Sequence, residues 1–196
     1  MAFQISEFTS ALAGDGARPN LFQVIMPGLP FGAAQGASAP FSFLCKATQL
    51  PGSTIGNVPL YYFGRETKFA GNRTFADWTI TVINDENFIV RNSIEAWMNS
   101  INSNASNLRL PSPVTGGGSG GQPYAIDAQV NQYYKSNTVG ANGIIKSYNF
   151  VGLFPVDLSP IDLDWGTNDS IEEFTVTFAY QYWTTGPSST GNVITS

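Results

Sequence analysis

The residues best suited to chemistry in this sequence are carboxylates gathered in the segment DLSPIDLDWGTNDSIEE. They are Asp157, Asp162, Asp164, Asp169, Glu172 and Glu173. Paired carboxylates could serve glycoside hydrolysis or calcium binding. The spacing of Asp162 and Asp164 predicts that both lie on one strand face in similar environments, and the segment lacks the Asp-x-Asp-x-Asp-Gly calcium pattern. We therefore favour a solvated acidic surface or turn-forming aspartates over a catalytic or metal site.

Other chemistry is limited by residues that the sequence lacks. There is no histidine, which excludes a Ser-His-Asp triad, a His-containing zinc site and an imidazole pH switch. The run GGGSGG at 116–121 is not followed by Lys-Ser/Thr, so it predicts a flexible loop and not a phosphate cradle. The single cysteine, Cys45, is expected to be a small buried apolar side chain. We expect no enzyme activity, no cofactor and no metal.

The composition favours one β-rich domain that takes part in an assembly. The chain has 196 residues, of which 42% are apolar, 13% aromatic and only 12% charged. The net charge of −5 comes from the second half, where Lys135 and Lys146 stand against seven acids. The absence of a basic stripe argues against tight nucleic-acid binding. No signal peptide and no run of 18 apolar residues is present, so we expect no membrane insertion by this chain.

Alternating apolar residues predict most of the secondary structure. Strands are expected at 21–26, 41–47, 78–82, 126–131 and 144–151, and a long last strand at 172–183. One main helix is expected from about Asp85 to Ile101, with Asn84 as its N-cap. Its apolar stripe is Val90, Ile94, Trp97 and Ile101. The acids Asp85 and Glu86 would stabilise the start of this helix and have no catalytic role.

The domain organisation follows from the loops. Segments 27–40 and 103–123 are rich in glycine, proline and small polar residues and predict long loops. We expect residues 1–183 to form a single domain and residues 184–196 a flexible C-terminal tail. Aromatic-rich strands in an open sheet would leave edges that invite uncontrolled pairing. Barrel closure or regular pairing between subunits would protect them, and the low charge favours pairing between subunits.

Four segments, read together, resemble the tail tube proteins of contractile-tailed bacteriophages. They lie at 17–26, 43–60, 64–86 and 150–183, in the order found in that family. The most specific parts are Cys45-Lys46-Ala47-Thr48, the run GNRTFADW at 71–78, and Leu163-Asp164-Trp165 before the last strand. The two long loops and the C-terminal tail depart from the family pattern.

The resemblance implies a fold and a set of partners. The fold would be a mainly β subunit, a sandwich or barrel with one main helix packed outside, whose strands join an inner β-barrel in a hexameric ring. Stacked rings would form a tube in the virion, assembled in the host cytoplasm. Its partners would be other copies, the surrounding sheath, and the baseplate and tail terminator at the ends. DNA would pass through without specific binding.

The lumen and the contacts between subunits have candidate residues. A surface that does not retain DNA should lack basic side chains. The lumen candidates are Asp127, Gln129, Asn131, Thr175 and Thr177. Segment 52–72 is expected to form an extended hairpin-like arm that touches a neighbouring subunit or ring, through Arg65, Glu66 and Lys68. An ordinary solvent-exposed hairpin is the alternative.

Two other functions remain open at this stage. One is the tube of a type VI secretion or other contractile injection particle, which carries proteins in place of DNA. The other is a glycan-binding or glycoside-cleaving β-sandwich, for which the aromatic and acidic residues would form a groove on a monomer.

Overall fold

The computed structural model describes residues 5–12, 16–26, 42, 44–106, 109, 124–135 and 143–186. These residues form mainly antiparallel β-structure, as predicted. The strands follow the hydrogen-bonded order β1-β6-β7-β8-β5-β2, and β9 also pairs with β7. The strands of the body are β1 (Phe22–Ile25), β2 (Cys45–Thr48), β5 (Trp78–Ile83), β6 (Ile126–Tyr133), β7 (Ile144–Leu158), β8 (Glu173–Ala179) and β9 (Tyr182–Thr185).

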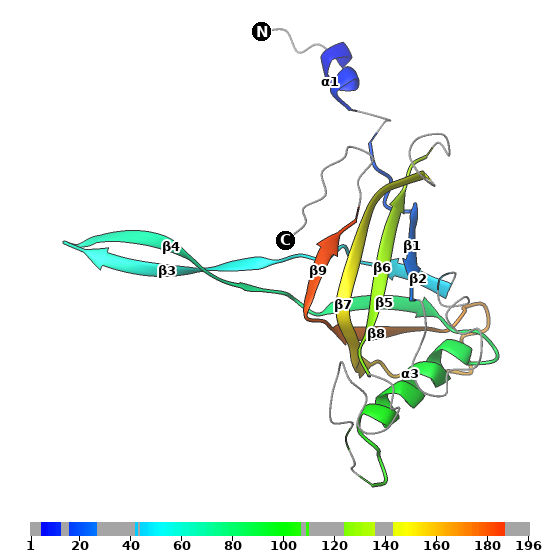
Figure 1. Ribbon diagram of the computed structural model, residues 1–196. Coiled ribbons are helices and arrows are strands. Elements are labelled where there is room, and N and C mark those ends of the chain that lie inside the picture. The colour runs from blue at the N-terminus through cyan, green and yellow to red at the C-terminus, as the bar shows by residue number, and fades with distance from the viewer. Residues whose placement is uncertain are drawn as a thin grey trace.

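The body is a sandwich of two sheets that share the long strand β7. The first sheet contains β1, β6, β9 and the first part of β7, whereas the second contains β2, β5, β8 and the end of β7. The strands of the two sheets cross each other at a steep angle (Figure 1). The inner faces meet in one core, where Trp78 of the second sheet stacks on Phe150 of the first at 4.4 Å between ring centroids.

The chain changes sheet twice, at points that the alternating pattern did not reveal. Strand β7 bends at Gly152, whose φ is +67°, a conformation that glycine adopts at low cost. The predicted last strand, 172–183, is divided into β8 and β9 by a break at residues 180–181. The prediction of one continuous strand is therefore wrong. The apolar letters alternate through the break, but the burial does not: Phe178 is buried and Tyr180 packs on the core, whereas Tyr182 is exposed and Trp183 packs on the core in its place.

The helix α3 (Ile89–Ile101) lies outside the sheets and closes one end of the sandwich (Figure 1). Val90, Ile94 and Trp97 are buried, which confirms the predicted stripe, and Ile101 is partly buried against the core. The Trp97 ring lies 6.1 Å from that of Phe178. Its indole N–H also donates to the carbonyl of Tyr124 at 2.7 Å, so the helix is fixed by both packing and a hydrogen bond.

The predicted start of this helix is wrong by four residues. The N-cap is Phe88, in a left-handed conformation, and not Asn84. The Ile89 N–H donates to Oδ1 of Asp85 at 3.1 Å, so Asp85 does serve the helix end. Asn84 instead directly follows β5, and its side-chain amide donates to Glu172 at 2.9 Å. The pattern could not distinguish these roles, because Asn and Asp are both good cap residues.

The ends of the described chain add two observations. The short helix α1 (Ile5–Ala11) lies apart from the sandwich (Figure 1). Strand β9 reaches Thr185, and the Gly186 N–H donates to the carbonyl of Ser147 at 2.9 Å, beyond the predicted domain boundary at 183. The predicted loop 27–40, most of 103–123 and residues 187–196 lie outside the described residues. None of the helices in the described part is long and apolar enough to cross a membrane.

Candidate functional site

A two-stranded arm is the most unusual feature of the surface. Strands β3 (Thr54–Tyr62) and β4 (Arg65–Thr74) pair only with each other among the described residues, and they project far from the sandwich (Figure 1). Every residue of β3 is exposed, as is nearly all of β4. The prediction of an extended hairpin over 52–72 is thus confirmed in shape.

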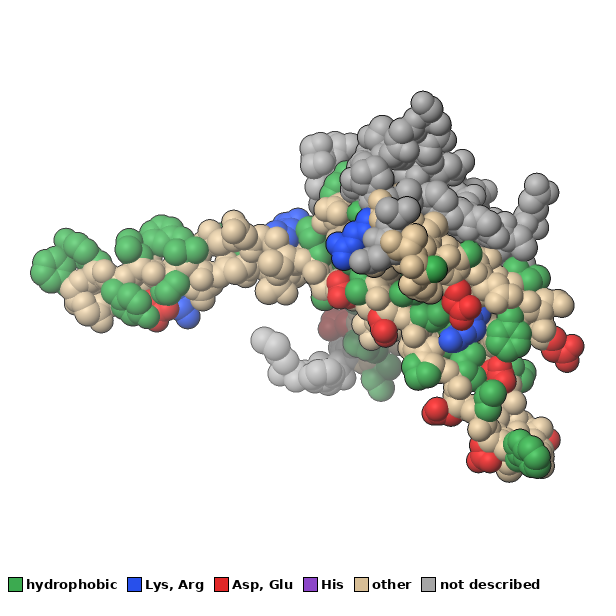
Figure 2. Space-filling model, turned by 90° about the horizontal axis from the view of Figure 1, so that it is seen from below, with side chains coloured by type: hydrophobic (Ala, Val, Ile, Leu, Met, Phe, Trp, Pro, Cys, Tyr) green, Lys and Arg blue, Asp and Glu red, His purple; other side chains and the backbone are tan. Residues whose placement is uncertain are grey.

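One face of the arm is apolar although none of the described residues outside the arm covers it. Val58 lies opposite Phe69, Leu60 opposite Thr67, and Tyr62 opposite Arg65. Hydrophobic side chains line the arm and its tip in Figure 2. A long, exposed and apolar pair of strands is an aggregation hazard for a monomer. Such a surface is typical of an interaction site.

The arm ends in a tight turn that presents aromatic rings to solvent. Phe63 and Gly64 both have positive φ, at 48° and 76°, as a two-residue type I′ hairpin loop requires. Phe63 is 92% exposed and packs edge-to-face on Tyr62, with 4.6 Å between ring centroids. A non-glycine residue in this conformation costs about 1–3 kcal/mol. The turn therefore holds a large apolar side chain where asparagine would fit more easily.

The three predicted contact residues lie together near this tip. Arg65 follows the turn, and the Lys68 ammonium lies 3.9 Å from a carboxylate oxygen of Glu66 on the opposite face from Tyr62. All three side chains are exposed, and an exposed ion pair of this kind contributes little to folding stability. Their charges are therefore available to a partner.

The base of the arm is shaped by two glycines. A Cβ atom on Gly71 would lie 3.1 Å from the carbonyl oxygen of Gly56, which is closer than backbone and side chain normally approach. The pairing register shifts between Ile55 and Asn57, so β4 contains an extra residue here. Such a bulge increases the local twist and sets the direction in which the arm leaves the body.

The acidic segment forms a hollow at the end of the second sheet. Residues 160–165, 167 and 170–173 line a depression of about 460 Å³. Asp162 and Asp164 lie in a loop, so the prediction that they share a strand face is wrong. The Gly166 N–H donates to Oδ1 of Asp164 at 2.9 Å, which makes Asp164 a turn-forming aspartate. The described residues hold no cluster of Asp, Glu, Cys or His that could bind a metal ion.

The same hollow exposes large apolar side chains. Leu163 is 80% exposed, Trp165 is 100% exposed and Ile171 is 70% exposed. Leu163 and Trp165 belong to the family resemblance, and the sequence pattern did not predict that they form an exposed surface. The apolar residues directly after Asp162 and Asp164 could have indicated it, since a loop has no buried face to receive such residues.

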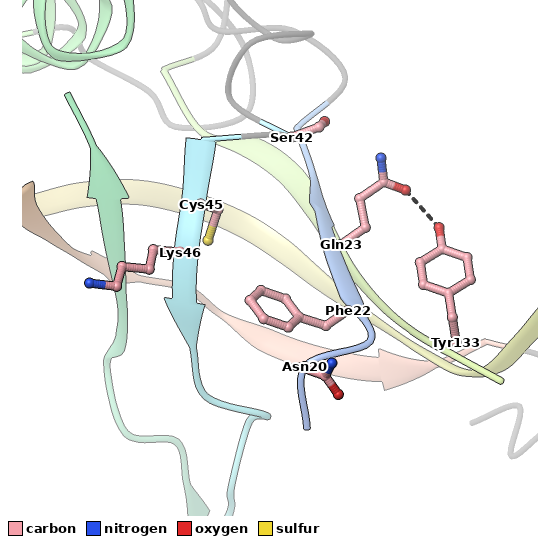
Figure 3. Close-up of a pocket in the computed structure, with 7 residues that line it drawn as sticks. All are labelled: Asn20, Phe22, Gln23, Ser42, Cys45, Lys46 and Tyr133. Carbon is pink, nitrogen blue, oxygen red and sulfur yellow. Dashed lines mark hydrogen bonds between the residues drawn. The ribbon is translucent and has the colours of Figure 1, made fainter. Parts of the chain in front are cut away.

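A second hollow lies between the edges of the two sheets. Figure 3 shows this groove of about 440 Å³ between β1 and β2, lined by Asn20, Phe22, Gln23, Ser42, Cys45, Lys46 and Tyr133. The Tyr133 hydroxyl donates to the side-chain oxygen of Gln23 at 2.6 Å, and Lys46 points away and pairs with Glu173. No carboxylate faces this groove among its described lining residues. Its groups are suited to packing and hydrogen bonding.

The Cys45 thiol is buried, as predicted. Burial raises its pKa from the ordinary value of 9.0 to about 12, an effect that the hydrogen bond to the Ala47 carbonyl reduces. The reactive form of cysteine is the thiolate. Cys45 therefore behaves as a small apolar core residue near neutral pH.

The five lumen candidates lie on two different surfaces. Asp127, Gln129 and Asn131 alternate with the core residues Ala128 and Val130, so they lie on the outer side of the first sheet. Thr175 and Thr177 alternate with core residues of β8 and lie on the outer side of the second sheet. The outer sides of a sandwich face away from each other, so one lumen cannot be lined by both sets.

The three polar residues of β6 also differ in accessibility. Asp127 is exposed and accepts the Gly152 N–H at 3.0 Å. Gln129 is half-buried and lies opposite Asn149. Asn131 is only 3% exposed, and its side-chain oxygen accepts the Ser147 hydroxyl at 2.7 Å. Of the three, Asp127 and Gln129 can meet solvent.

Comparison with known proteins agrees with these features. Residues 17–186 match the family model described as phage tail tube protein. The tail tube protein gp19 of Enterobacteria phage T4 is 35% identical over 173 residues, which cover 87% of this chain and 93% of that protein. The tail tube protein of Serratia phage KSP90 is 26% identical over 182 residues, covering 90% of this chain and 93% of that protein.

Solved structures share the fold at low sequence identity. The terminating cap of the anti-feeding prophage tube has a TM-score of 0.57 at 14% identity, covering 96% of this chain and 95% of that chain. A chain of the sheath-tube complex of an extracellular contractile injection system has a TM-score of 0.53 at 14% identity, covering 94% of this chain and 99% of that one.

The sandwich, its outer helix and the projecting arm define the class of protein, a structural subunit of a contractile phage tail tube. This chain belongs to the phage tail tube protein family, which confirms the resemblance in the sequence, and it is a component of the virion. Membership of this family argues against the alternative of a carbohydrate-binding or carbohydrate-cleaving sandwich.

Proposed function

We propose that this chain forms hexameric rings that stack into the inner tube of a contractile tail, and that DNA leaves the virion through this tube. The observation that carries the proposal is the arm, whose apolar face is exposed and not covered by the described part of the subunit. Contact with neighbouring copies would cover it. Residues 1–183, extended by the end of β9, would act as one domain in each ring.

The dimensions of a strand barrel agree with passage of duplex DNA. The first sheet has four strands, β1, β6, β7 and β9. In a ring of six subunits, roughly 24 strands spaced about 4.8 Å apart and tilted by about 40° give a backbone diameter of about 48 Å. Subtracting the side chains leaves about 35–40 Å, which is wide enough for a duplex.

The outer side of the first sheet is our proposed lumen surface. Gln129 and Asn149 lie opposite each other there, and Asp127 adds negative charge. The outer side of the second sheet instead carries Lys46, half-exposed and paired with Glu173. Each phosphate held by a basic residue adds salt-dependent affinity, so the first sheet is better suited to release DNA. The chain would act without catalysis or a cofactor.

The remaining partners are proposed from proteins of similar fold. Such folds occur in a sheath-tube complex, a baseplate and a terminating cap of contractile particles. We propose that the sheath surrounds this tube, and that the baseplate and tail terminator meet its two ends.

An injection particle that carries proteins is the second candidate. It is supported by the structural matches to the anti-feeding prophage and the extracellular injection system. The 35% identity with a phage protein is much higher than the 14% identity with those chains, so we favour the phage. A portal gene and a capsid gene beside this one would separate the two.

Electron microscopy of the purified protein tests the proposed assembly. Rings with sixfold symmetry, or tubes built from them, are the expected result across a range of protein and salt concentrations. A protein that stays monomeric throughout this range, although folded by circular dichroism, would contradict it. Images of end-on rings would also give the lumen diameter for comparison with about 35–40 Å.

A further inference from the structure

The acidic hollow has the features of a binding site for a segment that carries both aromatic and basic side chains. Its apolar lining is Leu163, Trp165 and Ile171. The loop 159–172 carries four carboxylates and no basic residue, and no ion pair within the described chain involves Asp162 or Asp164. Within the described chain, Asp164 accepts the Gly166 N–H, and neither carboxylate has a cationic partner.

The hollow is held in shape from both sides. At one end, the Ser159 hydroxyl accepts the Thr175 N–H at 2.8 Å, and the Ser159 carbonyl accepts a guanidinium N–H of Arg91 at 3.2 Å. At the other end, Asn84 bonds Glu172 through both its side-chain amide and its backbone N–H, each at 2.9 Å. A site that exists before binding loses less conformational entropy when a partner enters.

The tip of the arm has the complementary chemistry. Tyr62 is 72% exposed and Phe63 is 92% exposed, and Arg65 follows after Gly64. The arm as a whole holds three basic residues, Arg65, Lys68 and Arg73, against the single acid Glu66. Rigid aromatic and arginine side chains are the residue types that most often dominate binding energy at protein interfaces.

The two surfaces cannot meet within one subunit. The arm leaves the sandwich on one side, whereas the loop between β7 and β8 lies at the opposite end of the second sheet (Figure 1). Seen from below, the arm bears hydrophobic side chains, and several acidic ones lie at the end of the body away from it (Figure 2). Two different surfaces that complement each other produce head-to-tail contacts, which close into rings or continue as filaments.

We propose that the arm tip of one copy, formed by Tyr62, Phe63 and Arg65, docks in the acidic hollow of the next copy. The aromatic side chains of Tyr62 and Phe63 pack beside Leu163, Trp165 and Ile171. The Arg65 guanidinium pairs with the carboxylates of Asp162 and Asp164. The inference rests on the proposed self-assembly and names the surface that receives the arm. This contact would cover both the exposed aromatic side chains of the arm tip and the exposed apolar side chains of the hollow.

Charge reversal on each surface tests the contact. One variant carries Arg65→Glu and a second carries Asp162→Lys; Asp164 is left unchanged because it forms the turn with Gly166. Like charges across the contact oppose docking, so each variant should need at least about tenfold more protein to assemble. The double variant, Arg65→Glu with Asp162→Lys, should regain assembly. Thermal melting of each variant verifies that the sandwich is folded.

The outcomes separate this inference from the proposed function. If the natural protein forms rings or tubes and the Asp162→Lys variant forms them equally well, the hollow does not receive the arm. Failure of the double variant to regain assembly, while both single variants are folded, also overturns the inference. If the natural protein never assembles, it is the proposed function that fails.

A crosslink locates the contact directly. Cys45 is the only native cysteine and is buried, so introduced cysteines can be studied without interference. Phe63→Cys combined with Leu163→Cys should give disulfide-linked chains when assembled protein is treated with an oxidant. Phe63→Cys combined with Thr175→Cys is the matched control. Equal crosslinking of both pairs, or none in the first pair within intact assemblies, would argue against docking.

Discussion

Asp127 on β6 holds the bend of β7 through Gly152, whose N–H donates to the aspartate Oδ1 at 3.0 Å. Strand β7 leaves the first sheet and enters the second just after this point. The bend allows one strand to serve both sheets, and the shared core depends on it. Gly152 and Asp127 thus contribute to the architecture of the whole sandwich.

Gly152→Ala should destabilise the sandwich by about 1–3 kcal/mol, because φ here is +67° and alanine avoids that region. A Cβ atom would also lie 2.9 Å from Cγ of Gln181, which would have to move. Urea unfolding followed by tryptophan fluorescence measures the change. Gly52→Ala is the control, since no atom lies within 4 Å of its Cβ position. Equal midpoints for both variants would show that the bend tolerates a side chain.

The regular parts of the fold were predicted because burial and periodicity agree there. In β5 the buried residues Trp78, Ile80 and Val82 alternate with exposed or half-buried ones, and in α3 the stripe of Val90, Ile94 and Trp97 faces the core. Each of these elements has one buried face, so the spacing of its apolar residues indicates which side chains are buried.

The errors lie where local sequence does not determine the partner. Apolar letters alternate through the break between β8 and β9 although the core-facing residue shifts from Tyr182 to Trp183, and Asp162 and Asp164 alternate with apolar residues although they form a loop. The arm was expected, but its exposed apolar face carries the same pattern as a half-buried strand. We propose that neighbouring copies cover this apolar face, and the sequence of one chain does not show contacts between copies.

Shortening the arm should prevent assembly and leave the subunit folded. The change replaces residues 60–67 by Asn-Gly, which suits a two-residue hairpin and keeps Pro59 opposite Lys68. The described arm pairs with no other strand, so the melting temperature of the body should stay within a few degrees. Electron microscopy and sedimentation should show soluble subunits or isolated rings.

A matched variant separates the length of the arm from its aromatic tip. Phe63→Asn keeps every strand residue and replaces a strained residue by one that favours the same turn. If the tip supplies binding energy, this variant assembles less readily than the natural protein and more readily than the shortened arm. Normal tubes from the shortened arm would show that the hairpin is an ordinary solvent-exposed feature.

The Cys45 thiol should react slowly while the protein is folded. Burial raises its pKa to about 12 from 9.0, so at pH 8 the thiolate fraction is far below that of an unfolded chain. Because the folded state holds this proton more tightly, the thiol favours folding below pH 9 and loses this contribution as the pH rises toward 12. Reaction with Ellman's reagent should be complete within minutes in guanidinium chloride and take hours without it. Rapid reaction of the native protein would contradict the burial of this side chain.

Lysine on the lumen face should impair DNA passage without preventing assembly. Gln129→Lys and Asn149→Lys place positive charge on the outer side of the first sheet. The two residues lie opposite each other there, and each is half-buried. In the proposed tube of six-membered rings, each substitution would repeat along the lumen and add phosphate contacts whose affinity falls steeply with salt. Particles carrying both changes should have normal tubes by microscopy but eject DNA more slowly, and the defect should lessen at high salt. Thr175→Lys on the second sheet is the control, because that surface faces away from the proposed lumen. The result that would reverse the assignment is slow ejection with Thr175→Lys and normal ejection with the other pair, since the second sheet would then line the lumen.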